Sequence, residues 1–543
     1  MRHPTIIPLV EAAEFRPSLS VAPRLAPVTA RRILAGAAAC GIAGDALFGN
    51  AVCGSGLALY LTIVAFAVGG FSMSSIRALP LRVRGLLAAG VGFAALLLFR
   101  DSEALAFFNT VATLFFITLA AALSKPGATL ALTTARVRDL LGLLPAGVAE
   151  TASGAPRFLF SDVRAAFLGA DGTSRSGTAV AVARAVVLAV ILTVGFGLLL
   201  SGGDPVFRSL FAWPERWNAF DIPEHVFRFG LLAWPVMGLM WGTTRASRFP
   251  VDEILSNGIT LNRLDVVTAL GAMNALFATY LLLQVRVLFG GSAYVLETTG
   301  LTLAQYARDG FFALAFAAWL VLTVLLVLNA LLKEDRLGAW HVSRRLSTSL
   351  LVMVGLMLAS ATTRMLLYVG SFGITVDRIV ALAVMACLAI VSCWFFLTVL
   401  RERASRFVIG VVAAAGVTLF SLNVINPEAI VVRSALARAD KGGAFDVAYV
   451  SGLGSDAVPA LVDGLRAGRI PRTQVPALAS TTTTSATLIA TRNIATCIVA
   501  NRLVKQWADG GAGGMAAWTA SAARARRSVR QNRDMLDAQC DMP

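Results

Sequence analysis

The chain has 543 residues, of which 57% are hydrophobic and 14% are charged, and its mean hydropathy is +0.74. This composition excludes an ordinary soluble domain, in which about 25% of residues are charged, and makes the lipid bilayer the main solvent of the protein. The formal net charge of +16 could indicate a nucleic-acid partner, but most of it falls in short connections where membrane topology explains it, so we expect no nucleic-acid partner.

Apolar stretches follow one another along the chain, each close to the roughly 20 residues that a helix needs to cross a bilayer. They lack the alternating polarity of barrel strands, so we predict an all-α fold, a polytopic transmembrane helical bundle of about eleven spans. The sixth span is the least certain of the predicted spans, because Arg228, Pro235 and its short length also allow a re-entrant or tilted helix. The predicted spans cover residues 33–49, 55–75, 83–99, 104–124, 177–200, 226–242, 266–289, 311–332, 347–369, 379–400 and 406–423.

Arginine and lysine are unevenly distributed between these spans. The N-terminal segment and every second connection are rich in them, whereas none of the intervening connections holds more than two. Because short cytoplasmic loops retain positive charge, the N-terminus is predicted to be cytoplasmic and the C-terminal tail to lie on the far side. The excess of arginine over lysine, with abundant alanine and glycine, is typical of GC-rich bacterial genomes. We therefore predict a multi-pass protein of the bacterial inner (plasma) membrane.

This topology divides the chain into five parts. Within the connection after the fourth span, residues 131–148 place apolar side chains at helical spacing against charged ones. They predict an amphipathic helix that lies along the inner interface or packs on neighbouring spans. The parts are a cytoplasmic N-terminal segment (1–32), a four-helix membrane part (33–124), a cytoplasmic amphipathic connection (125–176), a seven-helix membrane core (177–423) and an extracytoplasmic helical tail (424–543).

The tail is predicted to consist of short helices. Asn426, Pro427 and Glu428 supply a capping side chain, a first-turn proline and a carboxylate that suits the helix dipole. Cys497 and Cys540 both belong to the tail. They could form a disulfide in an oxidising compartment, but sequence does not set the distance between them.

Several ordered motifs resemble one known group of proteins. They include residues 284–291 (QVRVLFGG), 304–312 (AQYARDGFF), 426–429 (NPEA), 446–449 (DVAY) and 456–461 (DAVPAL), with Arg364, Tyr368 and Arg378 between them. Over roughly residues 35–470 the chain resembles the bacterial polytopic membrane-protein group catalogued as domain of unknown function 4153/4173. Residues 434–438 depart from the pattern that follows the Asn-Pro motif. The resemblance implies the architecture and no particular activity.

Polar residues of these motifs gather at predicted span ends on the outer side, where the connections otherwise avoid arginine. Charged groups at membrane depth cost about 2.5 to 3.5 kcal/mol on insertion scales, so they are usually paired or functional. In a structural interpretation, the arginines pair with outer acids such as Asp45, Glu297 and Asp309, or cap helix ends. In a functional interpretation, they form a pocket for an anionic or carbonyl-rich ligand, because guanidinium groups suit phosphate and carboxylate. The candidate ligand-binding residues are Gln284, Arg286, Tyr306, Arg308, Arg364, Tyr368 and Arg378.

Groups for catalysis or proton transport are scarce. The three histidines, His3, His225 and His341, lie on separate segments, so we predict no catalytic residue, no metal site and no cofactor. Asp45 lies near the outer end of the first span, and we expect it to form a salt bridge rather than to carry protons. Other polar groups within spans can bond between helices or line a path, and they include Asn109, Asn274 and Asn329.

These observations favour a non-enzymatic membrane protein that recognises an anionic ligand or an envelope partner at its outer face. An anionic lipid or an envelope precursor would fit that chemistry, and the tail could bind a protein partner. Two alternatives remain open: a transporter or flippase of an anionic or lipid-linked solute, and a membrane-embedded enzyme that acts on lipid-linked material.

Overall fold

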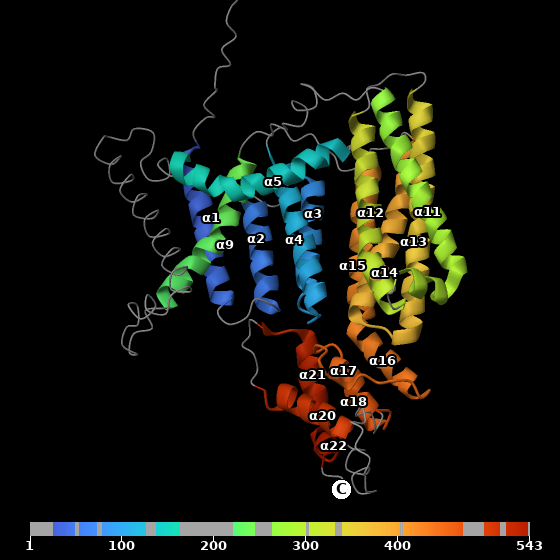
Figure 1. Ribbon diagram of the computed structural model, residues 1–543. Coiled ribbons are helices and arrows are strands. Elements are labelled where there is room, and N and C mark those ends of the chain that lie inside the picture. The colour runs from blue at the N-terminus through green and yellow to red at the C-terminus, as the bar shows by residue number, and fades with distance from the viewer. Residues whose placement is uncertain are drawn as a thin grey trace, which may run out of the picture.

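The computed structural model of the protein is helical in every element that it describes, which confirms the expected all-α class. The helices form two bundles that stand side by side and a smaller helical tail at one end of both (Figure 1). We call this the tail-side end, and the other the opposite end. The described residues are 25–48, 54–72, 79–125, 137–162, 221–244, 263–299, 303–331, 339–401, 403, 406–470, 494–510 and 517–540.

The first bundle is built from the N-terminal half of the chain. Its helices share one apolar core, in which Ile33, Val64 and Phe158 are almost fully buried. Small residues let these helices approach closely, as is usual where lipid supplies no hydrophobic drive between helices. The members are α1 (Pro27–Leu47), α2 (Ser55–Ser72), α3 (Leu81–Leu96), α4 (Glu103–Leu123), α5 (Val137–Arg157), the π-helical turn η2 (Phe158–Asp162) and α9 (Asp221–Thr243).

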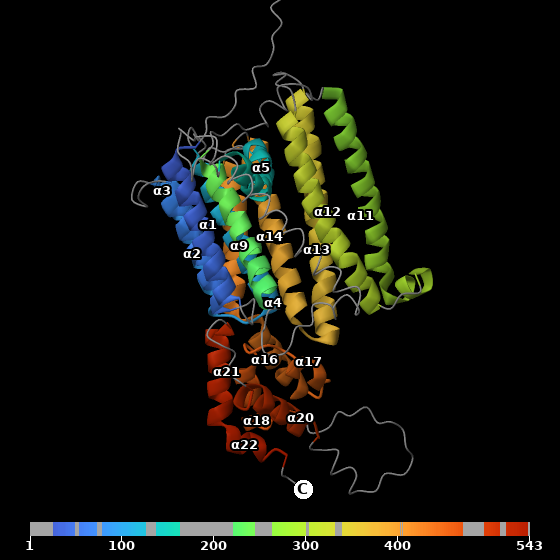
Figure 2. The same ribbon diagram turned by 90° about the vertical axis from the view of Figure 1, so that its left-hand side faces the viewer.

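The second bundle has its own apolar core, centred on Leu350, Val354 and Phe395. In Figure 2 its longest helix stands at the outer edge of the molecule. A left-handed Gly373, with φ of +83°, makes the short turn between the third and fourth helices possible. The members are α11 (Arg263–Thr299), α12 (Leu303–Leu331), α13 (Ala339–Phe372), α14 (Val376–Thr398), the 3-10 turn η3 (Val399–Arg401) and α15 (Phe407–Ile425).

Six stretches of helix in the described residues are long and apolar enough to cross a membrane, and one shorter apolar stretch covers Leu314–Leu328. Every predicted span except 177–200, which lies outside the described residues, overlaps a helix. The total of about eleven spans and their orientation stay predictions. The six stretches are Ser55–Ser72, Glu103–Leu123, Leu264–Leu282, His341–Phe372, Val376–Arg401 and Phe407–Ile425.

The amphipathic connection forms α5, which lies across the opposite end of the first bundle (Figure 1). It packs tightly on α9, because a Cβ on Gly154 would stand only 2.8 Å from the Cα of Gly238. Lys125, just after α4, reaches back to Glu150 with an Nζ to Oε1 distance of 2.7 Å. The described end of the predicted helix 131–148 lies against α4, because a Cβ on Gly147 would stand 2.8 Å from Thr118 Cγ2.

The sixth predicted span is one continuous helix, α9, which contains Pro235 and runs obliquely in Figure 1. It belongs to the first bundle in space, since the hydroxyl of Tyr60 on α2 donates to the carbonyl of Leu232 at 2.9 Å. This differs from the expected grouping of residues 177–423 into one core. Near its start, Arg228 Nη1 lies 3.7 Å from Asp45 Oδ1, so the predicted salt bridge of Asp45 is confirmed, and His225 Nδ1 lies 2.7 Å from Asp45 Oδ2.

The two bundles meet where α4 packs against α15. The side-chain amides of Asn109 and Asn423 bond reciprocally there, each donating to the other at 3.0 Å, and both are buried. Within the second bundle, Asn274 Nδ2 donates to the carbonyl of Leu346 at 3.1 Å. Asn109 and Asn274 thus bond between helices, whereas Asn329 has a side chain outside the described residues.

An apolar groove of about 350 Å³ lies beside this contact, between α3 and α4 on one side and α15 on the other. Aromatic and aliphatic side chains form all of its walls, so it offers no charged or amide group to a polar ligand. Its lining residues are Phe93, Phe116, Ile409, Val412, Ala413, Gly416, Val417 and Phe420.

The tail folds around a third apolar core that includes Val432, Leu461 and Trp507. It contacts both bundles: Ala520 N donates to the Leu98 carbonyl of the first at 2.6 Å, and Val376 N of the second donates to Tyr449 Oη at 3.0 Å. The tail helices are α16 (Pro427–Ala439), α17 (Val447–Ser451), α18 (Val458–Arg466), α20 (Ile494–Leu503), the π-helical turn η5 (Val504–Ala508), α21 (Ala520–Gln531) and α22 (Arg533–Asp537).

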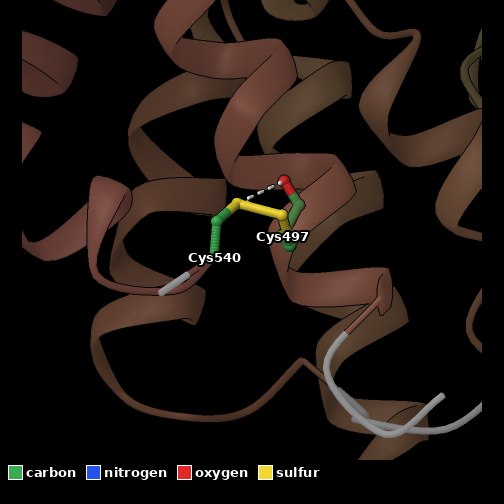
Figure 3. Close-up of a disulfide and its surroundings, with 2 residues drawn as sticks. All are labelled: Cys497 and Cys540. Atoms are coloured by element: carbon green, nitrogen blue, oxygen red, sulfur yellow. Dashed lines mark hydrogen bonds between the residues drawn. A yellow bond between two sulfur atoms is a disulfide. The ribbon is translucent and has the colours of Figure 1, made fainter. Parts of the chain in front are cut away.

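Cys497 of α20 and Cys540, beyond α22, form a disulfide (Figure 3). The possibility left open by the sequence is therefore realised in the structure. The bond ties the last turn of the chain to a helix 43 residues earlier, and such a cross-link restricts the unfolded chain more than the folded one.

We expect the double substitution Cys497→Ser and Cys540→Ser to leave the membrane helices intact and to loosen the end of the tail. The tail should then be cleaved faster by trypsin, because its final helices are rich in arginine. Non-reducing electrophoresis of the wild type, with and without reductant, checks the bond itself. Identical mobility of the two samples would contradict the disulfide, and Cys393→Ser, which removes an unpaired exposed cysteine, serves as the control.

Candidate functional site

The predicted ligand-binding residues lie on the four helices α11 to α14. For Gln284, Arg286, Tyr306 and Arg308 the structure describes the backbone alone, and their side chains lie outside the described residues. The first two fall in the second half of α11 and the other two in the first two turns of α12, and these helices meet at the tail-side end (Figure 1). Their mutual contacts stay a prediction.

The turn between α13 and α14 brings two of the other predicted residues together. The guanidinium carbon of Arg378 lies 4.1 Å from the centre of the Tyr368 ring, a cation–π arrangement. The same guanidinium donates to the carbonyl of Gly373, and Thr375 caps α14 by accepting from Arg378 N at 3.4 Å. Arg364 lies one helical turn before Tyr368 on α13, on the same face. The turn therefore presents arginine and tyrosine side chains at the tail-side end.

A further arginine reaches this turn from the tail, and sequence reasoning missed it. A Cβ at residue 373 would collide with the guanidinium of Arg438, which lies in the last turn of α16. Nη1 of Arg438 is buried and has no hydrogen-bond partner within the described residues. In the sequence, Arg438 stood only at the end of the stretch that departs from the family pattern, more than 60 residues from Gly373, so no local signal connected the two.

A second polar cluster joins the tail to both bundles, and we call it the joint. Arg100, after α3, donates through Nη1 to Asp456 Oδ1 at 2.8 Å and through Nε to the carbonyl of Asn423 at 2.6 Å. The backbone N–H of Asp101 donates to the other oxygen of Asp456 at 3.0 Å. Asn426, in the left-handed region with φ of 57°, caps α16 as predicted and donates to the Asp456 carbonyl at 3.4 Å. The joint thus connects the α3–α4 turn, the end of α15 and the loop before α18.

Glu428 is the unusual group of the joint. It is only 6% exposed, and its Oε2 has no hydrogen-bond partner within the described residues. Burial, followed by the nearby Asp456 and Asp101, raises the pKa of Glu428 to about 7. Burial also raises the pKa of Asp101. The Asn-Pro-Glu motif that contains Glu428 was visible in the sequence, but the carboxylates of Asp101 and Asp456 that lie near it come from other segments of the chain.

Among the described residues, no group of three or more His, Cys, Asp or Glu side chains is suited to hold a metal ion.

The chain was compared with curated proteins, solved structures and family models. No curated protein and no solved structure matches the chain. A family model described as a domain of unknown function matches residues 87–464, a range that includes the α13–α14 turn, Arg438 and the joint. This match confirms the resemblance seen in the sequence motifs, and the chain belongs to that family, domain of unknown function 4153 (DUF4153).

Proposed function

We propose that this member of the family is a non-enzymatic membrane protein that recognises an anionic ligand or envelope partner at its tail-side face. The observation that carries the proposal is the α13–α14 turn, where Arg378 is stacked on Tyr368 and held by the Gly373 carbonyl. A guanidinium fixed in this way keeps a preorganised edge for a phosphate or carboxylate group. Arg364 on the same face, with Gln284, Arg286, Tyr306 and Arg308 on the adjoining helices, would complete the site.

Two observations support an outward orientation of this face in the bacterial inner membrane. The distribution of positive charge between the spans favours a cytoplasmic opposite end. The disulfide between Cys497 and Cys540 favours an oxidising compartment for the tail. The ligand would then be an anionic lipid or an envelope precursor, and the tail would be free to meet a protein partner.

Native mass spectrometry of the gently extracted protein tests this proposal. We expect an anionic molecule to accompany the wild type and to be lost from the double variant Arg364→Ala and Arg378→Ala. The matched control is Arg344→Ala with Arg345→Ala. It removes the same charge from the exposed start of α13 at the opposite end, and it should keep the ligand. Equal ligand retention by both variants would contradict the proposal.

The two alternative functions predict different results in liposomes. A transporter or flippase would move the recovered ligand across the bilayer at a rate that the Arg364 and Arg378 substitutions lower. An enzyme would convert the ligand to a product without net movement. Binding with neither flux nor product is the outcome expected here.

A further inference from the structure

Two guanidinium groups from different parts of the chain converge on one glycine. Arg378, from α14 of the second bundle, donates to the carbonyl of Gly373. The guanidinium of Arg438, from α16 of the tail, occupies the place where a Cβ on the same residue would stand. The absence of a side chain at Gly373 therefore permits both the left-handed backbone of the turn and the close approach of Arg438.

Neither Arg378 nor Arg438 takes part in an ion pair within the described residues, although Asp377 directly precedes Arg378 on α14. Asp440, the acid nearest to Arg438 in the sequence and the residue that follows α16, is already bound by Arg469, whose Nε lies 2.9 Å from Asp440 Oδ2. Two like charges held beside one residue repel each other, and a buried donor without a partner costs about 1 to 3 kcal/mol. An anion placed between the two guanidinium groups would remove both costs.

We infer that Arg378 and Arg438 together hold a phosphate group, so that the ligand is bound between the second bundle and the tail. The inference rests on the proposed anion recognition and adds the chemical class of the ligand and the half of the site that the tail supplies. Phosphate suits the position because its several oxygens can accept from two guanidinium edges at once, with each bond assisted by charge. Tyr368 holds Arg378 in place by stacking, and the α16 C-terminal turn holds Arg438, whose carbonyl accepts from Gly443 N at 2.9 Å.

The phosphate could belong to a lipid headgroup or to a soluble molecule, and two arms of one experiment separate these sources. In the first arm, inorganic phosphate is titrated into the full chain in a phosphate-free detergent, at constant ionic strength. In the second arm, phosphatidylglycerol is added to the same detergent and the retained lipid is counted by native mass spectrometry. Binding in either arm is expected.

Arg438→Ala should weaken binding by about tenfold or more in the arm that shows binding. The control Arg433→Ala removes an exposed arginine from the same helix and should bind as the wild type does. Arg438→Lys keeps the positive charge and the aliphatic part of the side chain but loses the two-pronged guanidinium group. Its affinity for phosphate should therefore fall between that of Arg438→Ala and that of the wild type. If Arg438→Ala fails to fold, wild-type affinity of Arg438→Lys overturns the inference.

The failure of this inference is distinguishable from the failure of the proposed function. If Arg438→Ala retains wild-type affinity while the Arg364 and Arg378 double variant loses its ligand, anion recognition stands and the role of the tail arginine is wrong. If neither arm shows binding to the wild type but a carboxylate ligand co-purifies, the phosphate class is wrong. Slower hydrogen exchange at residues 373–378 on addition of phosphate, absent in Arg438→Ala, would support the inference directly.

Discussion

Replacing Arg100 by alanine is expected to destabilise the attachment of the tail by about 3 to 5 kcal/mol, the usual cost of breaking a buried ion pair from one side. Asp456 has a side chain only 2% exposed and would remain buried without its cation. The carbonyl of Asn423 would also lose its donor. The expected result is a lower midpoint for thermal unfolding of the tail in detergent and faster proteolysis near α18, while the membrane helices remain folded.

Arg469→Ala is the matched control for this experiment. It breaks the pair between Arg469 and Asp440, in which both side chains are about two-fifths exposed. Water and salt screen such surface pairs, so we expect little change. Equal losses in the two variants would show that burial of the Arg100 pair does not matter. Adding Asp456→Asn to Arg100→Ala should recover part of the loss, because it removes the unpaired buried charge.

Replacing Glu428 by glutamine is expected to flatten the dependence of stability on pH. Its pKa is about 7 in the folded protein, against an ordinary value of 4.5. The unfolded chain therefore releases this proton at lower pH than the folded one does. Folding stability should fall as the pH rises from about 4.5 to about 7 and then level off, with a total loss of about 3 kcal/mol. Glutamine keeps the shape of the side chain without the charge, so the variant should be the more stable protein at pH 8 and not at pH 4.5.

Thermal midpoints of the tail measured between pH 4.5 and pH 8 check this expectation. Asp463→Asn, at an exposed carboxylate on α18, is the control and should follow the wild-type curve. Some dependence on pH will remain in Glu428→Gln, because the pKa of Asp101 is raised by burial as well. A Glu428→Gln curve parallel to that of the wild type would exclude Glu428 as the titrating group.

Local features of the fold could be predicted from the sequence because they depend on short stretches of chain. Insertion of a helix into lipid depends on the hydropathy of about 20 consecutive residues, and ten of the eleven predicted spans overlap helices of the structure. The cap at Asn426 and the helical periodicity of α5 are equally local. The sequence also placed Tyr368 at the end of one predicted span and Arg378 at the start of the next, and the structure stacks the two side chains across the short turn between them.

Contacts between distant segments could not be predicted in the same way. Asp456 pairs with Arg100 across 356 residues, and Arg438 reaches Gly373 from a different part of the fold. Nothing in the apolar periodicity of α9 indicated that it packs with α1 and α2 in preference to the helices that follow it. These choices depend on how surfaces of small residues fit together and on which buried polar groups find partners.

The sequence by itself thus determined that the chain is an all-α protein rich in helices able to span a membrane, and it identified the family motifs. The tertiary structure decided which bundle each helix joins, and it brought Arg438 to the candidate site and Glu428 into the joint. The physical reason is that lipid solvation acts on each segment separately, whereas ion pairs, amide pairs and close glycine contacts require two surfaces to meet.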